Sequence, residues 1–137
     1  MAKHIVWEES FKVGHPMIDS QHKRLFEIAD ELYGLILAPP EKRKSDTILV
    51  LQDCVKYVNF HFGCEEKIMR DSKYEDVDTH LSQHEAFTTY IASLMNDSSR
   101  GIKVDLEKLY EFLADWLVNH ICSEDKKLAA YVSAIPQ

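Results

Sequence analysis

The sequence has few of the residues that interrupt regular secondary structure. Only 4 of its 137 residues are glycine and 4 are proline. An all-β protein needs many turns, and turns are rich in these two residues, so their scarcity favours long helices. With 45% hydrophobic and 28% charged residues, the composition is that of a globular protein. The length predicts a single domain, residues 1–137, with one hydrophobic core.

Long hydrophobic runs and positive charge are also lacking. No stretch of about 18 apolar residues occurs, so we expect no membrane-spanning helix. The start, MAKHIVWEES, has no apolar segment of the kind that a secretory signal requires. The 16 Lys and Arg residues are outnumbered by 23 Asp and Glu, and the net charge of −7 repels nucleic-acid phosphates. These absences predict a cytoplasmic protein with neither a membrane nor a nucleic acid as partner.

Cysteine is present only as Cys54, Cys64 and Cys122. The number is odd and there is no CxxC pair, so the spacing lacks the signature of a thiolate zinc site. In a reducing cytosol we interpret all three as buried or half-buried thiols that pack as small hydrophobic side chains.

Apolar residues recur at helical spacing in four long segments. The predicted helices cover residues 19–38, 41–71, 75–97 and 105–122, and a short C-terminal helix covers 124–134. Residues 1–18 are predicted to form an N-terminal arm, after which Asp19 or Ser20 caps the first helix. Short loops make neighbouring helices antiparallel, so the expected fold is all-α: an up-down-up-down four-helix bundle with an N-terminal arm.

Histidines fall on the inward face of each of the four long helices. Residues four apart on a helix share a face, since they differ by about 40°. The third helix carries His80 and His84 at this spacing, the second carries His61 and Glu65, and His22 and His120 lie on the apolar stripes of the first and fourth. Hydrogen bonds alone hardly satisfy five buried imidazoles, whereas metal binding does.

The number of imidazoles indicates more than one metal ion. Imidazole suits iron, zinc, copper or nickel, and five exceed what one tetrahedral zinc takes. Two ions bridged by carboxylates would use them all, and Glu65 is placed to bridge. A second bridge is expected beyond His120, where an ideal helix places Glu124 about 40° from His120 and Asp125 about 140° away. Only a π-bulge, a kink or a helix end near residues 121–123 would turn Asp125 inward.

Four short motifs occur in order along most of the chain: VGHPMIDSQHKRL, HFGCEE, HLSQH and HICSED. Together with Trp7 they resemble the hemerythrin family, and within it the bacterial single-domain kind, the bacteriohemerythrins. The resemblance implies two iron ions joined by an oxo or hydroxo bridge. It also selects Asp125 over Glu124 as the second bridging carboxylate, and so implies that the fourth helix is irregular at that point.

The resemblance further implies a role for each residue. The terminal ligands are His22, His61, His80, His84 and His120, and the bridging carboxylates are Glu65 and Asp125. In the family, the iron held by His80, His84 and His120 has no free coordination position. The iron held by His22 and His61 keeps one open coordination position, where dioxygen binds. An apolar oxygen pocket is expected from Leu25, Phe62, Trp116, Leu117 and Ile121, positions that ordinary core packing explains equally well.

These expectations lead to a functional hypothesis with two alternatives. The leading hypothesis is a non-enzymatic protein that binds dioxygen reversibly for storage, delivery or sensing. Di-iron bundles that activate oxygen are typically rich in carboxylates, whereas imidazoles dominate here. One alternative is a di-iron enzyme acting on peroxide or nitric oxide, which the lack of a general acid or base beyond the ligands disfavours. The other is an oxygen-responsive module that contacts or supplies a protein partner.

Overall fold

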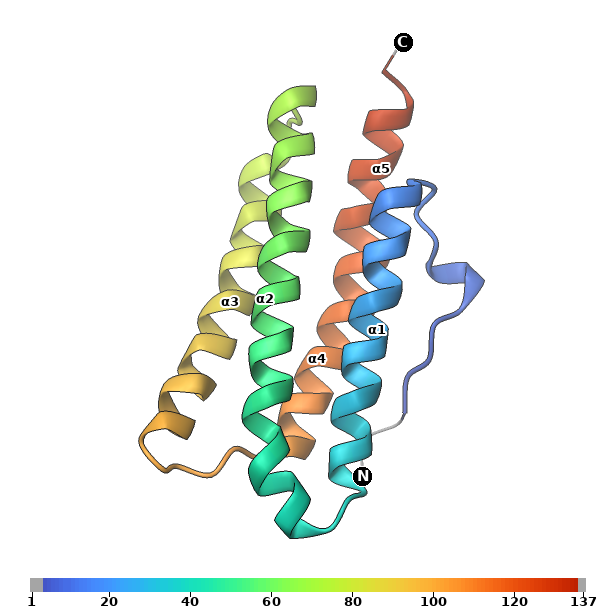
Figure 1. The fold of residues 1–137 in the computed structure, drawn as a ribbon. Coiled ribbons are helices and arrows are strands. Elements are labelled where there is room, and N and C mark those ends of the chain that lie inside the picture. Colours follow the sequence, from blue (N-terminus) through green and yellow to red (C-terminus); the bar gives the residue numbers. More distant parts are fainter. Residues whose placement is uncertain (1–3, 136–137) are drawn as a thin grey trace.

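Four long helices stand side by side in the computed structural model, which describes residues 4–135 apart from the side chains of residues 44 and 45 (Figure 1). They are α1 (Pro16–Ile36), α2 (Pro40–Ser72), α3 (Val77–Ser99) and α4 (Leu106–His120). A π-helical turn, η2 (Ile121–Asp125), joins α4 to α5 (Lys126–Ser133), and a short 3-10 turn, η1 (Glu9–Phe11), lies in the arm. The predicted all-α, up-down-up-down bundle is confirmed.

The first helix begins earlier than predicted. Pro16 lies in the first turn, where its missing N–H would have no helical partner, and the Nδ1 of His15 accepts a hydrogen bond from the Ile18 N–H. The predicted cap at Asp19 or Ser20 is therefore wrong. Instead the Asp19 carboxylate accepts hydrogen bonds from the backbone N–H groups of Val13 (2.7 Å) and Gly14 (3.3 Å). Asp19 thus ties the arm to α1.

The N-terminal arm runs back along the outside of α1 (Figure 1). Trp7 packs edge-on against Phe26 of α1, with ring centroids 5.6 Å apart. The backbone N–H of Ile5 donates a 2.7 Å hydrogen bond to the hydroxyl of Tyr110 on α4. The arm therefore covers one side of the bundle instead of extending into solvent.

The hydrophobic core fills the space between the four long helices. Its most deeply buried members come from all of them, including Leu25, Ile28, Leu51, Phe87, Ile91, Tyr110, Leu117 and Ile121. A second, smaller cluster consists of Ile18, Met69, Tyr74 and Leu128. Within the part of the chain that the structure describes, no helix is both long and apolar enough to cross a bilayer.

The three cysteines differ in exposure, which corrects the expectation that all would be buried or half-buried. Cys54 is buried and Cys64 is intermediate, but Cys122 is exposed. Cys122 lies in the π-helical turn, two residues after the inward-facing His120, on the side that faces solvent. Burial raises the pKa of the Cys54 thiol to about 12.

This difference predicts selective alkylation. In the folded protein near neutral pH, iodoacetamide should modify Cys122 first and leave Cys54 unmodified. Because the thiolate is the reactive form, the raised pKa of Cys54 slows its reaction roughly a thousandfold relative to a free thiol. Peptide mass spectrometry over time measures both rates, and Cys122→Ser should remove the fast phase. Equal rates at Cys54 and Cys122 in the folded protein would contradict the burial described here.

Candidate metal centre

The bundle brings together all seven residues that the sequence singled out as ligands. They are His22 of α1, His61 and Glu65 of α2, His80 and His84 of α3, His120 of α4 and Asp125 of η2. None of them is more than 3% exposed. Since the four long helices each contribute, the cluster exists only in the assembled bundle.

Two groups of donor atoms can be distinguished within the cluster. Glu65, His80, His84 and His120 form one, and His22, His61, Glu65 and Asp125 form the other; in each group the donor atoms lie within 4.8 Å of one another. We call these the three-histidine group and the two-histidine group. Glu65 belongs to both, and its Oε1 lies 3.0 Å from the Nε2 of His61 and 3.3 Å from the Nε2 of His84.

Asp125 also faces both sides of the cluster, one carboxylate oxygen to each. Its Oδ1 lies 2.8 Å from the Nε2 of His120 and 3.2 Å from the Nε2 of His80, both in the three-histidine group. Its Oδ2 lies 2.6 Å from the Nε2 of His22 in the two-histidine group. Glu65 and Asp125 are thus the two carboxylates positioned to bridge a pair of cations.

The inward position of Asp125 depends on the π-helical turn. A π turn holds more residues than an α turn, so η2 rotates Asp125 onto the face that His120 occupies. Glu124, which ideal periodicity favours, is also buried at 6% exposed, but it belongs to neither group of donor atoms. Local geometry therefore overrides the ideal-helix expectation.

This geometry predicts different consequences for the two neighbouring carboxylates. Asp125→Asn should lower metal uptake strongly, by more than the roughly 10–100-fold typical of losing a group that only contacts a ligand. Glu124→Gln should leave uptake within about threefold of the parent protein. Metal analysis after dialysis against a weak chelator compares them. The assignment would be wrong if Glu124→Gln were the more damaging substitution.

The donor atoms fit metal ions because hydrogen bonding leaves most of them unsatisfied; the exceptions are the Nε2 of His22 and the Oδ2 of Asp125, which form a 2.6 Å hydrogen bond with each other. Seven buried donor atoms have no hydrogen-bond partner within the described residues: the Nε2 atoms of His61, His80, His84 and His120, both carboxylate oxygens of Glu65 and the Oδ1 of Asp125. Although these atoms lie close to one another, none is in hydrogen-bond geometry. A buried polar atom without a partner is costly, and imidazole nitrogens with carboxylate oxygens are ligands that iron and similar ions accept.

Three of the five imidazoles are oriented by a hydrogen bond from the opposite ring nitrogen. The Nδ1–H groups of His61, His120 and His84 donate to Gln21 Oε1 (2.7 Å), Gln83 Oε1 (2.8 Å) and Glu66 Oε2 (3.1 Å), respectively. Such a bond fixes the tautomer and aims Nε2 inward. Periodicity did not reveal these three partners. Their only signal in the sequence is that each adjoins a predicted ligand.

The carboxylates and imidazoles shift one another's pKa values. Burial opposes the charged form of His61, but the negative charges of Glu65 and Asp125 outweigh it and raise the pKa of His61 to about 9. The same balance raises the pKa of His80 to about 9 and also raises that of His120. Burial likewise opposes ionisation of Glu65, yet the surrounding histidines hold its pKa well below the usual range. A metal ion entering this site must therefore displace protons from the imidazoles.

Aromatic rings cover the three-histidine group. The ring of Phe62 stacks on His84 with centroids 3.8 Å apart, and the half-buried Trp116 stacks on His120 at 4.3 Å. Leu25, Leu117 and Ile121 are at most 1% exposed and belong to the core. All five residues expected in the apolar pocket thus lie in or against the core, and Phe62 and Trp116 stack on histidines of the three-histidine group.

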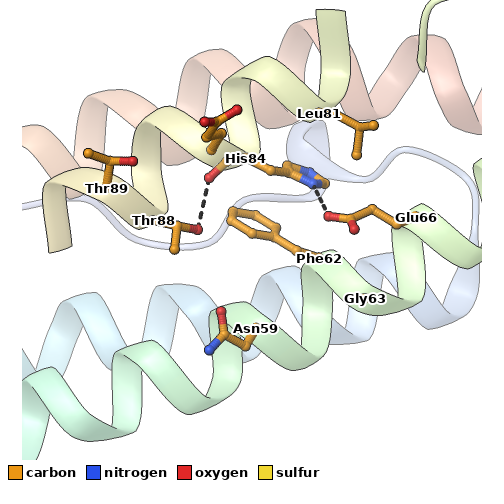
Figure 2. Close-up of a pocket in the computed structure, with 9 residues that line it drawn as sticks. Asn59, Phe62, Gly63, Glu66, Leu81, His84, Thr88 and Thr89 are labelled. Carbon is orange, nitrogen blue, oxygen red and sulfur yellow. Dashed lines mark hydrogen bonds and ion pairs between the residues drawn. The ribbon is translucent and has the colours of Figure 1, made fainter. Parts of the chain in front are cut away.

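A surface pocket between α2 and α3 reaches the site from outside (Figure 2). Phe62 and Glu66 from α2 and His84 and Leu81 from α3 are among its lining residues. Phe62 therefore has one side on this pocket while its ring is stacked on His84. Phe62 and His84 thus form the part of the pocket lining that lies nearest to the cluster.

The sequence matches a known protein family over most of its length. Residues 13–132 match the family described as the Hemerythrin HHE cation binding domain. The chain belongs to the hemerythrin family. A bacteriohemerythrin of Pseudomonas aeruginosa (strain LESB58) is 32% identical over 132 residues, which cover 96% of this chain and 82% of that protein. A myohemerythrin of Theromyzon tessulatum is 31% identical over 122 residues, 88% of each chain.

Solved structures agree with this membership. A crystal structure of wild-type hemerythrin matches the present fold with a TM-score of 0.88 and 27% sequence identity, covering 96% of this chain and 100% of that one. The hemerythrin family is known for binding oxygen at a non-heme di-iron site. The family resemblance drawn from the four sequence motifs is confirmed.

Proposed function

We propose that this hemerythrin-family chain binds dioxygen reversibly at a di-iron centre, for oxygen storage, delivery or sensing. The observation that carries the proposal is the pair of buried donor groups that share Glu65. Their donors are imidazole nitrogens and carboxylate oxygens, most of them without a hydrogen-bond partner among the described residues, and iron accepts both kinds.

Each donor group would hold one iron ion. His80, His84 and His120 would hold the first and His22 and His61 the second, with Glu65 and Asp125 shared between them. The two-histidine group offers one imidazole fewer, which leaves its ion with room for an external ligand. When bound, the iron pair supplies the electrons and the open position that dioxygen binding requires.

The protein's own side chains would hold the ligands in place and keep water out. Gln21, Gln83 and Glu66 keep three imidazoles turned inward through their hydrogen bonds. The rings of Phe62 and Trp116 stack on His84 and His120 and cover them with apolar surface, and Leu117 and Ile121 are buried in the core. Such a dry environment favours reversible binding, because water and protons promote loss of the bound gas in a reduced form.

The composition of the donor set favours reversible binding over oxygen activation. Five imidazoles and two carboxylates supply less negative charge than the carboxylate-rich sites of oxygen-activating di-iron bundles. High-valent iron is therefore stabilised less. Within the described residues, the only carboxylates in either donor group are Glu65 and Asp125.

An optical experiment tests the proposal. Protein loaded anaerobically with ferrous iron should bind two iron ions per chain and develop a visible charge-transfer colour in air. The colour should bleach on deoxygenation and return over several cycles, whereas zinc-loaded protein should stay colourless. Ferrous protein that remains stable and colourless in air would refute the proposal, as would a colour that never reverses.

A further inference from the structure

His84 is distinguished from the other site histidines by the group that its outer nitrogen contacts. The outer nitrogens of His61 and His120 donate to neutral amides, those of Gln21 and Gln83. The Nδ1 atoms of His22 and His80 are buried and find no hydrogen-bond partner in the part of the chain that the structure describes. Only His84 donates to a carboxylate, Glu66 Oε2, at 3.1 Å.

Glu66 stands at the boundary between the buried centre and the surface. It directly follows Glu65 on α2, yet it lines the pocket between α2 and α3, where its carboxylate points toward the ring of His84 (Figure 2). Its side chain is 35% exposed, while that of His84 is 4% exposed. A single hydrogen bond therefore links a buried site imidazole to a carboxylate that solvent reaches.

A carboxylate does more at this position than an amide. Both accept the Nδ1–H bond and so fix the orientation of the ring, but the carboxylate also carries a negative charge. That charge draws the Nδ1 proton toward Glu66 and leaves more electron density on the ring. The Nε2 atom then becomes a stronger donor to a cation, and most strongly so to the cation of higher charge.

We propose that Glu66 is a positioning residue that acts through His84 to strengthen metal binding at the three-histidine group and to favour its oxidised state. The inference rests on the proposed function insofar as His84 is taken to be a metal ligand. It makes the two metal positions unequal, because neither histidine of the two-histidine group has a charged outer partner. Gln21 and Gln83 orient their histidines without this effect.

The substitution Glu66→Gln tests the charge alone, because glutamine still offers an oxygen to the Nδ1–H of His84. Binding of zinc, which is redox-inert, should weaken about tenfold for one of the two bound ions, at the lower end of the effects known for such partners. In iron-loaded protein, the reduction equilibrium should move about tenfold toward the ferrous state, which corresponds to about 59 mV for one electron.

Two further variants separate this effect from general electrostatics and from folding. Glu85→Gln removes the same charge from the same pocket, but Glu85 does not accept the hydrogen bond from the His84 ring, so this variant should change zinc affinity and the reduction equilibrium by less than about twofold. Gln83→Glu places a carboxylate on the outer nitrogen of His120 and should shift the potential in the opposite direction to Glu66→Gln. Thermal unfolding of the metal-free variants verifies that Glu66→Gln and Glu85→Gln fold alike.

The outcomes distinguish this inference from the proposed function. Equal zinc affinities and potentials for Glu66→Gln and Glu85→Gln would overturn the role of Glu66. A tenfold loss of zinc affinity in Glu66→Gln would support it even if the iron-loaded protein failed to bind dioxygen reversibly, because the zinc measurement involves no oxygen. Unchanged zinc affinity in His84→Ala would show that His84 is not a metal ligand and would overturn the inference, because Glu66 is proposed to act through His84.

Discussion

Replacing Glu65 by alanine should abolish stable uptake of both metal ions. Glu65 is the residue that the three-histidine and two-histidine groups share, and it is 0% exposed. Its removal takes a donor from each group and a negative charge from between the imidazoles. Losing a residue that only hydrogen-bonds to a metal ligand weakens metal affinity by about 10–100-fold. Losing a residue shared by both donor groups should therefore weaken metal affinity by more than about 100-fold. Iron content after anaerobic loading and dialysis measures the effect.

Glu111→Ala provides the matched control, since Glu111 is an exposed glutamate on α4. It should bind iron like the parent chain. Circular dichroism of metal-free Glu65→Ala should show the helical content of the parent, so that loss of iron reflects loss of the ligand and not of the fold. Two tightly held iron ions in Glu65→Ala would contradict the shared role of this carboxylate.

Replacing Phe62 by alanine should have the largest effect among the residues that surround the centre. The Phe62 ring is 4% exposed, stacks on His84 and packs edge-on against Phe87 at 5.9 Å. Truncating a buried phenylalanine typically costs about 3–5 kcal/mol of unfolding free energy, and urea denaturation measures this loss. Because Phe62 also lines the pocket between α2 and α3, its removal should widen the path for water past His84 toward the buried donor atoms.

The functional consequence of that path is faster oxidation. Iron-loaded Phe62→Ala should lose its reversible colour in air at least about tenfold faster than the parent protein, because water and protons reach the centre. Phe60→Ala is the control, since Phe60 is a neighbouring phenylalanine that is 57% exposed. It should affect neither stability nor colour lifetime appreciably. Equal behaviour of the two variants would show that Phe62 does not separate the centre from solvent.

Helix periodicity accounted for most of the fold and for most of the cluster. The spacing of four residues between His80 and His84, and between His61 and Glu65, placed each pair on one helix face, and the structure turns these faces inward. His22 and His120 followed from their apolar neighbours in the same way. The pattern of apolar residues along one helix determines which face of that helix is buried, so the sequence was sufficient to predict which histidines face inward.

The helical periodicity of the sequence did not predict contacts between helices or departures from ideal helix geometry. Gln83 of α3 accepts from His120 of α4, and Gln21 of α1 accepts from His61 of α2. Such pairs depend on how two helices are placed against each other, which the spacing within one helix does not specify. The start of α1 at Pro16 and the exposure of Cys122 were mispredicted because each depends on local backbone geometry.

The sequence by itself determined that this chain forms four amphipathic helices with imidazoles on their inward faces, because a regular helix converts spacing directly into direction. It left Glu124 and Asp125 as alternatives, and only the family resemblance favoured Asp125. The tertiary structure decided between them: the π-helical turn Ile121–Asp125 rotates Asp125 into the cluster, where its two oxygens face different histidine groups. The structure also decided which imidazole contacts an outer carboxylate, because that contact joins Glu66 and His84 across two helices.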